Sequence, residues 1–247
     1  MLDRKGLRVQ WMMARGAERS FNTRLKQIAK QIGIIISGMA PEGVVHDTQE
    51  VTGVLEEYSK LILPWARAVS RYMIADVSRR NLRGWMLNGA EMAQALRAEI
   101  KQAPTGMLFS ALMDEQVSLI QSLPLSAAKR VHELTEGALY SSARADVVAR
   151  EILNTGNVTK ARATLIARTE VSRTASNLTQ ARAMFAGSEG YIWRTSKDSD
   201  VRPTHQAQEG KYIAWNMPPK TDKGLDPYHA GCGPNCRCYP DPVLPDL

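Results

Sequence analysis

The spacing of apolar residues limits the possible folds of this chain more than any other feature. From about Met12 to Phe185, apolar side chains recur every three or four residues, which is the period of an amphipathic helix. One such stripe consists of Leu55, Tyr58, Ile62, Trp65, Val69, Met73 and Val77. Because a stripe of this kind has to pack against a core, we expect a helical body over this range.

Prolines and polar caps predict where the helices begin and end. Proline lacks an N–H donor, so Pro64 predicts a kink or a restart, with Pro64 in the first turn of the next helix. Another helix is expected over Met107–Leu123, ended by Pro124. A long helix is then expected to begin with Thr159 as its N-cap and to end near Phe185, stopped by Gly187 and Gly190.

The pattern changes after Gly190. Tyr191, Trp193 and Thr195 alternate with other residues, and Lys211–Trp215 is rich in strand formers, so we expect a few strands here. Prolines disfavour regular secondary structure over most of the remaining chain. They are Pro218, Pro219, Pro227, Pro234, Pro240, Pro242 and Pro245. The end of the chain is therefore expected to consist of loops and an extended acidic tail.

These patterns predict a mainly α fold, with an elongated helical body followed by a small α+β C-terminal module of few strands. The expected parts are a basic N-terminal helical segment over residues 1–50, a helical body over 51–186, and the α+β module with its Pro-rich tail over 187–247. Hydrophobic residues make up 44% and charged residues 23% of the chain. These values are ordinary for a globular protein and exclude a wholly disordered chain.

The net charge of +7 favours an anionic partner, either nucleic acid or an acidic protein surface. Most of the excess lies in the first thirty residues, where eight basic residues stand against Asp3 and Glu18. The basic residues are Arg4, Lys5, Arg8, Arg15, Arg19, Arg24, Lys26 and Lys30. Two interpretations stay open: a solvated helix face, or a surface that binds DNA or another anionic partner.

The sequence contains no apolar run of about 18 residues that would span a membrane, and no signal-peptide core follows its charged start. We therefore expect the protein to be made and kept in a cytoplasm. Its three cysteines all lie within the last sixteen residues. Disulfides are thus not expected to hold the main body together.

The last third of the chain carries a set of short motifs in a fixed order. They are Ile166-Ala-Arg-Thr-Glu170, Trp193-Arg-Thr-Ser-Lys-Asp198-Ser-Asp200-Val-Arg202-Pro-Thr-His205, Gly210-Lys211, Pro218-Pro219, His229 and Cys236-Arg237-Cys238. In this order and spacing they resemble the phage Mu protein F family of head morphogenesis proteins. The resemblance runs from about Thr159 to Pro242 and is fainter upstream.

This resemblance implies a structural virion protein rather than an enzyme. Members of the family are low-copy minor capsid proteins at the portal vertex, needed for head assembly or DNA delivery. The implied partners are the portal protein, the major capsid or scaffolding protein, and double-stranded DNA. The implied location is the phage head near the portal vertex, after synthesis in the host bacterial cytoplasm, with no membrane span.

The C-terminal cysteines suggest a metal site. His229, Cys232, Cys236 and Cys238 offer the four N/S donors of a tetrahedral structural zinc site, with His205 as an alternative fourth ligand. The usual His-x-x-Cys-Arg-Cys ending of the family looks expanded here and has an extra cysteine. Reduced thiols filling a small core, and a Cys232–Cys238 disulfide formed outside the host, remain open alternatives.

A polar group follows the first expected strand. Asp198, Asp200, Arg202 and His205 would suit a metal-dependent nuclease or a toxin-like transferase. We favour a turn network, in which the aspartates accept backbone N–H groups, Arg202 pairs with one of them and His205 bonds locally. No nucleophile stands next to a base, and the sequence has no glycine-rich phosphate loop.

Arg168 and Glu170 are expected to join this structural network. A buried Arg–Glu pair would tie the long helix to the strand module at Trp193, and we expect Arg168 to hydrogen-bond the Asp198 turn. A further interpretation of the chain is a host-derived DNA-binding zinc module with a helical oligomerisation arm. That interpretation predicts stoichiometric zinc and DNA binding by the C-terminal part.

Overall fold

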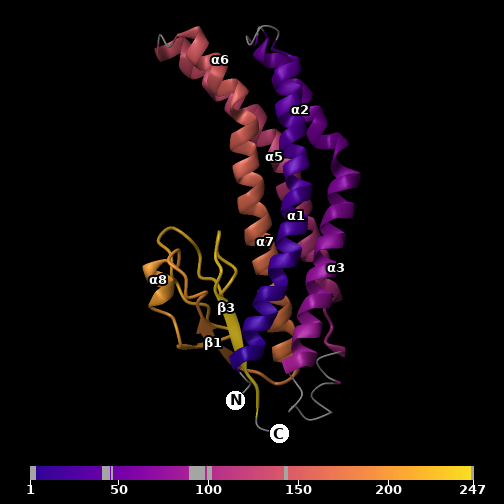
Figure 1. The fold of residues 1–247 in the computed structure, drawn as a ribbon, viewed down its shortest axis with the longest axis vertical. Helices are drawn as coiled ribbons and strands as arrows, with labels where there is room; N and C mark the ends of the chain where they lie inside the picture. The colour runs from indigo at the N-terminus through magenta and orange to yellow at the C-terminus, as the bar shows by residue number, and fades with distance from the viewer. Residues whose placement is uncertain are drawn as a thin grey trace. The chain divides into compact units, whose positions relative to one another are not determined.

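The computed structural model of the chain describes residues 4–40, 45, 47–88, 98, 102–141 and 144–245 (Figure 1). Its contacts divide the chain into two compact units, each assembled from separate stretches. The first unit contains Met1–Arg19, Tyr72–Leu112 and Arg168–Leu247, and the second contains Ser20–Arg71 and Met113–Ala167. The three-part division of the chain near residues 50 and 186 stays a prediction.

Helices account for most of the described residues, as the apolar period predicts. They are α1 (Arg4–Gly38), α2 (Thr48–Leu61), α3 (Leu63–Asn88), α5 (Gly106–Ser141), α6 (Ala145–Leu153), α7 (Thr155–Phe185) and the short α8 (Pro203–Gln206). No helix in the described part of the chain is long and apolar enough to cross a membrane. The predicted class, mainly α with a small α+β C-terminal module, is confirmed.

Two prolines in the second unit behave differently. Pro64 stands in the first turn of α3, directly after the break at Ile62, as predicted. Pro124 does not end a helix, because α5 continues through it, so that prediction is wrong. The proline removes one backbone hydrogen bond. The apolar face nevertheless continues on both sides of it, at the buried Leu123 and Ala127, and its packing keeps the helix intact.

Helix α7 begins earlier than predicted and ends where predicted. Thr159 is not the N-cap, because it lies inside the helix and donates its hydroxyl to the carbonyl of Thr155 at 2.8 Å. The N–H of Val158 already bonds the carbonyl of Asn154, which closes the first turn before Thr159. At the other end, Gly187 adopts a φ of +82°, the left-handed cap that glycine favours.

The strands form an antiparallel sheet in the order β2-β1-β3. Their bounds are Gly190–Arg194 for β1, Tyr212–Ala214 for β2 and Tyr239–Val243 for β3. Strand β3 corrects the expectation that prolines keep the chain end irregular, because Pro240 pairs with Trp193 and Pro242 pairs with Tyr191. An edge strand tolerates proline because the missing N–H would face away from its neighbour.

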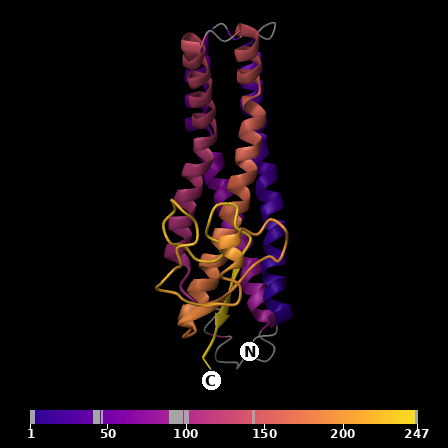
Figure 2. The same cartoon turned by 90° about the vertical axis from the view of Figure 1, so that its left-hand side faces the viewer.

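The first unit packs this sheet and its loops on α7 through an aromatic core. Figure 2 shows the loops between the strands lying over the C-terminal half of α7. The buried members of the core are Trp85, Ala183, Ala186, Tyr191, Trp193, Trp215, Ala230, Cys236 and Cys238. Two of the three cysteines are thus core residues of the unit.

Candidate functional site

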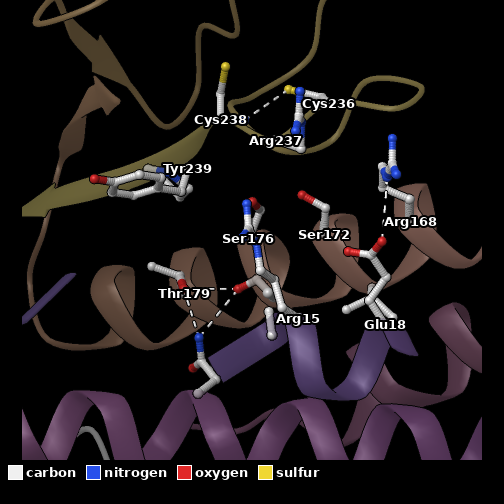
Figure 3. A pocket seen from close by; sticks show the side chains of 15 residues that line it. Arg15, Glu18, Arg168, Ser172, Ser176, Thr179, Cys236, Arg237, Cys238 and Tyr239 are labelled. Carbon is white, nitrogen blue, oxygen red and sulfur yellow. Dashed lines mark hydrogen bonds and ion pairs between the residues drawn. The ribbon is translucent and has the colours of Figure 1, made fainter. Parts of the chain in front are cut away.

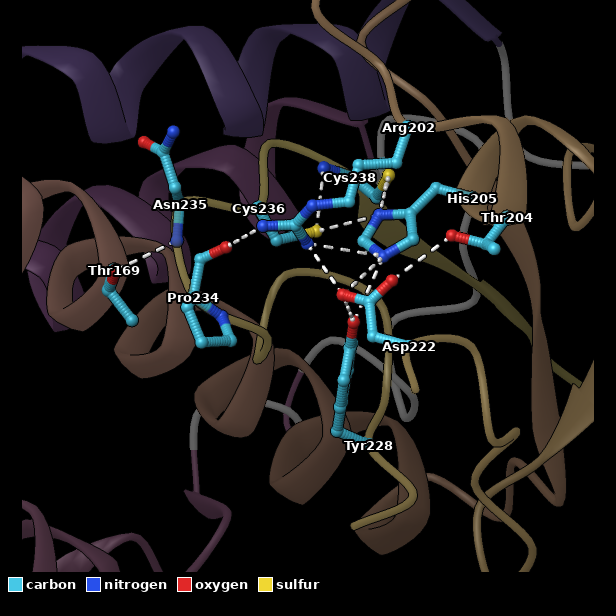
Figure 4. Close-up of polar contacts among 10 residues, drawn as sticks. All are labelled: Thr169, Arg202, Thr204, His205, Asp222, Tyr228, Pro234, Asn235, Cys236 and Cys238. Atoms are coloured by element: carbon cyan, nitrogen blue, oxygen red, sulfur yellow. Dashed lines mark hydrogen bonds and ion pairs between the residues drawn. The ribbon is translucent and has the colours of Figure 1, made fainter. Parts of the chain in front are cut away.

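Three potential metal ligands meet in the core of the first unit. His205 lies in the one-turn helix α8, whereas Cys236 and Cys238 lie on the segment that leads into β3. The Nδ1 atom of His205 is 3.5 Å from the Sγ atom of each cysteine (Figure 4). All three residues are at most 3% exposed. The group is a compact set of one imidazole and two thiols, with its donor atoms within 4.8 Å of one another.

Helix α7 holds the segment that carries the two cysteines. Asn235 adopts a left-handed φ of +54°, which turns the chain just before Cys236. Its N–H donates to the hydroxyl of Thr169 at 2.9 Å, and its side-chain oxygen accepts a hydrogen bond from Arg168 at 2.9 Å. Both partners belong to α7, so the helix fixes the position from which the cysteines reach His205.

The other ring nitrogen of His205 faces a polar group that sequence reasoning missed. Its Nε2 atom is 3.0 Å from the Tyr228 hydroxyl and 3.6 Å from Oδ2 of Asp222. Asp222 accepts a hydrogen bond from Tyr228 at 2.5 Å. It also accepts from Arg202 at 2.8 Å and from Thr204 at 3.1 Å. Asp222 and Tyr228 lie in an irregular loop, where no periodic pattern marks them.

The surroundings of Asp222 determine its protonation state. Burial raises the pKa of Asp222, but hydrogen bonds from Tyr228 and Thr204 outweigh it, and the net pKa is below the usual value. The nearby charge of Arg202 acts in the same direction. Burial and the hydrogen bond to Asp222 raise the pKa of Tyr228. At neutral pH the pair is therefore a carboxylate beside a neutral phenol.

The two buried thiols differ in acidity. A hydrogen bond from the Cys238 thiol lowers the pKa of Cys236, and the contact with His205 adds to that effect against the opposing effect of burial. The pKa of Cys238 is raised, first by its hydrogen bond to Cys236 and then by burial. Cys236 is the more readily ionised of the two, and the thiolate is the form that binds metals.

Asp198 and Asp200 form the predicted turn, but with a different arginine. The N–H of Asp200 donates to Oδ1 of Asp198 at 3.2 Å. Arg237 contacts both carboxylates at 2.8 Å. The prediction that Arg202 pairs with one of these aspartates is wrong, because its guanidinium reaches Asp222 instead. The available sequence signal for Arg237 was its place in the Cys-Arg-Cys motif.

Arg168 lies outside the Asp198 turn. Its guanidinium contacts Glu18 of α1 at 3.4 Å (Figure 3) and the side chain of Asn235 at 2.9 Å. The expected hydrogen bond to Asp198 is absent from the described contacts, because these partners occupy Arg168 and Arg237 occupies Asp198. Arg168 instead joins α1 and α7 to residues 235–238, which carry the two buried cysteines and are called the cysteine segment.

Glu170 and Trp193 are both buried, at 2% and 0% exposure. Glu170 pairs with Arg173 of the same helix at 3.5 Å, and Arg173 also donates to the carbonyl of Cys232 at 3.4 Å. The Arg–Glu pair that links α7 to the C-terminal module is therefore formed with Arg173. The Trp193 ring meets His205 edge-on, with ring centres 5.6 Å apart.

The structure places the remaining predicted zinc ligands elsewhere. The ring of His229 lies between the Tyr191 hydroxyl at 3.2 Å and the Trp215 carbonyl at 3.1 Å. Cys232 contacts Asn177 of α7 at 3.5 Å. Among the described residues, the metal-ligand group contains His205 with Cys236 and Cys238, and it includes neither His229 nor Cys232.

Two small cavities adjoin the cysteine segment. One of about 50 Å³ lies between this segment, α1 and α7, and Figure 3 shows its lining. The other, of about 40 Å³, is lined by His205, both buried cysteines and Ser196. The hydroxyl oxygen of Ser196 is buried and has no hydrogen-bond partner in the described part of the chain. This second cavity is polar and has about the size of a water molecule.

The basic residues of the N-terminal segment all lie on α1. The side chains of Arg4, Lys5 and Arg8 are outside the described part of the structure. Arg15 and Arg19 are exposed in the first unit. The second unit contains the others, of which Arg24 and Lys26 are half-buried and Lys30 is exposed.

A groove of about 830 Å³ in the second unit brings two of these lysines together with a third. Lys26 and Lys30 on α1 and Lys160 on α7 line it, and no acidic residue lines it among the described ones. The helices approach closely at this point, because a Cβ atom on Gly156 would lie 3.1 Å from the Cα of Gly33. The groove is a candidate surface for anions.

Comparisons with known proteins agree with the motifs of the last third. Residues 129–240 match the model of a family described as phage Mu protein F like protein. An uncharacterized protein of Haemophilus influenzae is 32% identical over 135 residues, which cover 55% of this chain and 29% of that protein. The chain thus spans less than a third of that relative's length. No solved structure matches the chain.

Proposed function

Because residues 129–240 are phage Mu protein F-like, we propose that the chain is a structural component of a phage head and acts by binding. In its finer form, the proposal is a minor capsid protein near the portal vertex. There it contacts the portal protein, capsid or scaffolding subunits, and packaged double-stranded DNA. The family match is the observation that carries this proposal.

The polar residues of the C-terminal module support an architectural role. Asp198, Asp200 and Asp222 all accept hydrogen bonds or ion pairs from neighbouring arginines of the module. The cavity beside His205 has room for roughly one water molecule, far less than the several hundred Å³ of a typical small-molecule site. A nuclease working at His205 would need an open cleft for its substrate.

A binding experiment tests the structural role. The purified full chain is mixed with the portal protein and with the capsid and scaffolding proteins encoded beside it. We expect a complex with the portal protein that survives high salt, because contacts between apolar surfaces are not screened by ions. A phage that assembles normal, infectious heads without the gene would contradict the proposal. DNA cleavage with Mg²⁺ that Asp200→Asn abolishes in a folded protein would also contradict it.

The lysine groove of the second unit, formed with Lys26, Lys30 and Lys160, supports the DNA contact. Lys26 and Lys30 are one helical turn apart and share a face of α1. None of the three amines has an ion pair or hydrogen bond in the described part of the chain. Like charges gathered in this way repel one another, so a bound phosphate backbone would relieve that repulsion.

The salt dependence of DNA affinity tests this surface. Each phosphate neutralised contributes about 0.9 to the slope of log affinity against log salt, so three lysines contribute about 2.7. We expect the triple variant Lys26→Gln, Lys30→Gln, Lys160→Gln to lose about that much of the slope. The control is Lys211→Gln, Lys220→Gln, Lys223→Gln, which removes the same charge from exposed residues of the first unit. An equal loss in both variants would contradict a specific groove.

A further inference from the structure

We propose that His205, Cys236 and Cys238 bind one Zn²⁺ ion, with a water molecule in the adjoining 40 Å³ cavity as the fourth ligand. This structural site would join α8 to the segment that enters β3. The inference is independent of the proposed function, because it rests on the donor atoms of the first unit alone.

The two nitrogen-to-sulfur distances in the group match those of a tetrahedral zinc site. With Zn–N near 2.0 Å and Zn–S near 2.3 Å, a tetrahedral angle places nitrogen and sulfur about 3.5 Å apart. The Nδ1 atom of His205 is 3.5 Å from both Sγ atoms. A neutral imidazole has one lone pair, so it accepts one thiol hydrogen well, whereas a cation among the three atoms satisfies both contacts.

The second ring nitrogen of His205 is arranged as in a metal-bound histidine. Nε2 lies 3.0 Å from the Tyr228 hydroxyl and 3.6 Å from the carboxylate of Asp222. A carboxylate on this side favours a hydrogen on Nε2 and leaves the Nδ1 lone pair for the metal. In addition, the N–H of Cys238 points to Sγ of Cys236 at 3.4 Å, which favours a thiolate there.

The 40 Å³ cavity beside His205 provides the space for the fourth zinc ligand. It is lined by the three proposed ligands and by Ser196, whose buried hydroxyl oxygen has no hydrogen-bond partner within the described residues. A metal-bound water in this space would give that hydroxyl a partner. Three protein ligands with a water in the fourth position form the ligand set of many catalytic zinc sites, whereas structural sites usually have four protein ligands. The cavity is nevertheless too small for an organic substrate, and on that ground we assign the site a structural role. Two thiolates and an imidazole favour zinc over hard cations such as Mg²⁺.

Metal content and cobalt spectra test the site. We expect one zinc per chain in protein purified without a histidine tag, and none in Cys236→Ser or Cys238→Ser. The matched controls Cys232→Ser and His229→Gln should keep the full zinc content, because neither residue belongs to the group. Retention of zinc by Cys236→Ser, or its loss from Cys232→Ser in a folded protein, would overturn the assignment.

The wild-type chain provides a test that does not depend on the folding of variants. After removal of metal under reducing conditions, we add Co²⁺ and record the spectrum. We expect thiolate-to-cobalt charge-transfer bands and the strong visible bands of a four-coordinate ion, both displaced by one equivalent of zinc. A reduced, folded wild-type protein that takes up neither zinc nor cobalt would overturn the proposal.

Discussion

The hydroxyl of Ser176 on α7 donates to the carbonyl oxygen of Ala230 at 2.7 Å, and in this position it fills the space beside the next residue, Gly231. A Cβ atom on Gly231 would collide with that hydroxyl and would lie 2.9 Å from the carbonyl oxygen of Cys238. Gly231 also has a φ of +85°. This residue therefore has two separate reasons to be glycine.

Gly231→Ala is expected to lower the free energy of unfolding by about 2–5 kcal/mol, from left-handed strain and overpacking together. The measurement is urea denaturation followed by tryptophan fluorescence. The control is Gly224→Ala, which has a φ of +81° but open space around its Cβ position. It should lose only about 1–2 kcal/mol. Equal losses in the two variants would show that the contact with Ser176 contributes nothing.

The stability of the first unit should depend on the protonation of His229. Burial lowers the pKa of its ring, although the hydrogen bond to the Trp215 carbonyl opposes this. The folded protein therefore takes up the proton at lower pH than the unfolded chain, whose histidine titrates near 6.5. Since the unfolded chain binds more protons below that pH, the free energy of unfolding should fall as the pH decreases from about 7 to 5.

Urea denaturation at both ends of this pH range measures the effect. His229→Gln should show a smaller decrease than the wild type, because the ring that resists protonation is gone. His132→Gln serves as the control, since His132 is an exposed side chain of α5. If all three proteins lose the same stability on acidification, His229 is not the group responsible.

Pro124→Ala is expected to stabilise the second unit. A proline inside a helix costs about 3 kcal/mol relative to alanine, because its N–H is missing. The substitution also removes roughly two buried CH₂ groups, which costs about 1.6 kcal/mol. We therefore expect a net gain of about 1 kcal/mol and a higher melting temperature by circular dichroism. A loss of stability would mean that α5 needs the bend or the bulk of this proline.

Arg202→Gln should destabilise the C-terminal module by about 1–3 kcal/mol, because Arg202 bridges Asp222 and the carbonyl of Pro234. The control is Arg150→Gln, whose exposed guanidinium pairs with the exposed carboxylate of Asp146 within one turn of α6. Such surface pairs contribute about 0.5 kcal/mol or less. Thermal unfolding of both variants distinguishes the two kinds of ion pair. A loss no larger than that of the control would remove Arg202 from the module's structural contacts.

The sequence predicts well those parts of the fold that depend on neighbouring residues. Pro64 marks the start of α3 and Gly187 the end of α7, because both act on the backbone next to them. The predictions made from Pro124 and Thr159 are wrong, because at these positions the local preference of the residue does not decide the structure. Their local preferences to end or begin a helix are overridden by apolar packing and by a first turn closed earlier in the chain.

The sequence predicts which types of residue form the candidate site, but not which of them contact one another. His205 rather than His229 lies beside the cysteines, although His229 is the nearer of the two histidines in the sequence. Which histidine reaches the thiols depends on how the segment from Thr195 to Tyr228, with its loops, folds over α7. Asp222 and Arg237 likewise take their roles from contacts across that loop, which no local pattern encodes.

The first unit joins stretches from the start, the middle and the end of the chain. Glu18 on α1, for example, pairs with Arg168, which follows 150 residues later in the chain. During translation this part of α1 must leave the ribosome long before its partners on α7 and in the cysteine segment exist. Completion of the unit is thus postponed until the chain has been translated through β3, and a product that terminates before this strand would lack the complete unit.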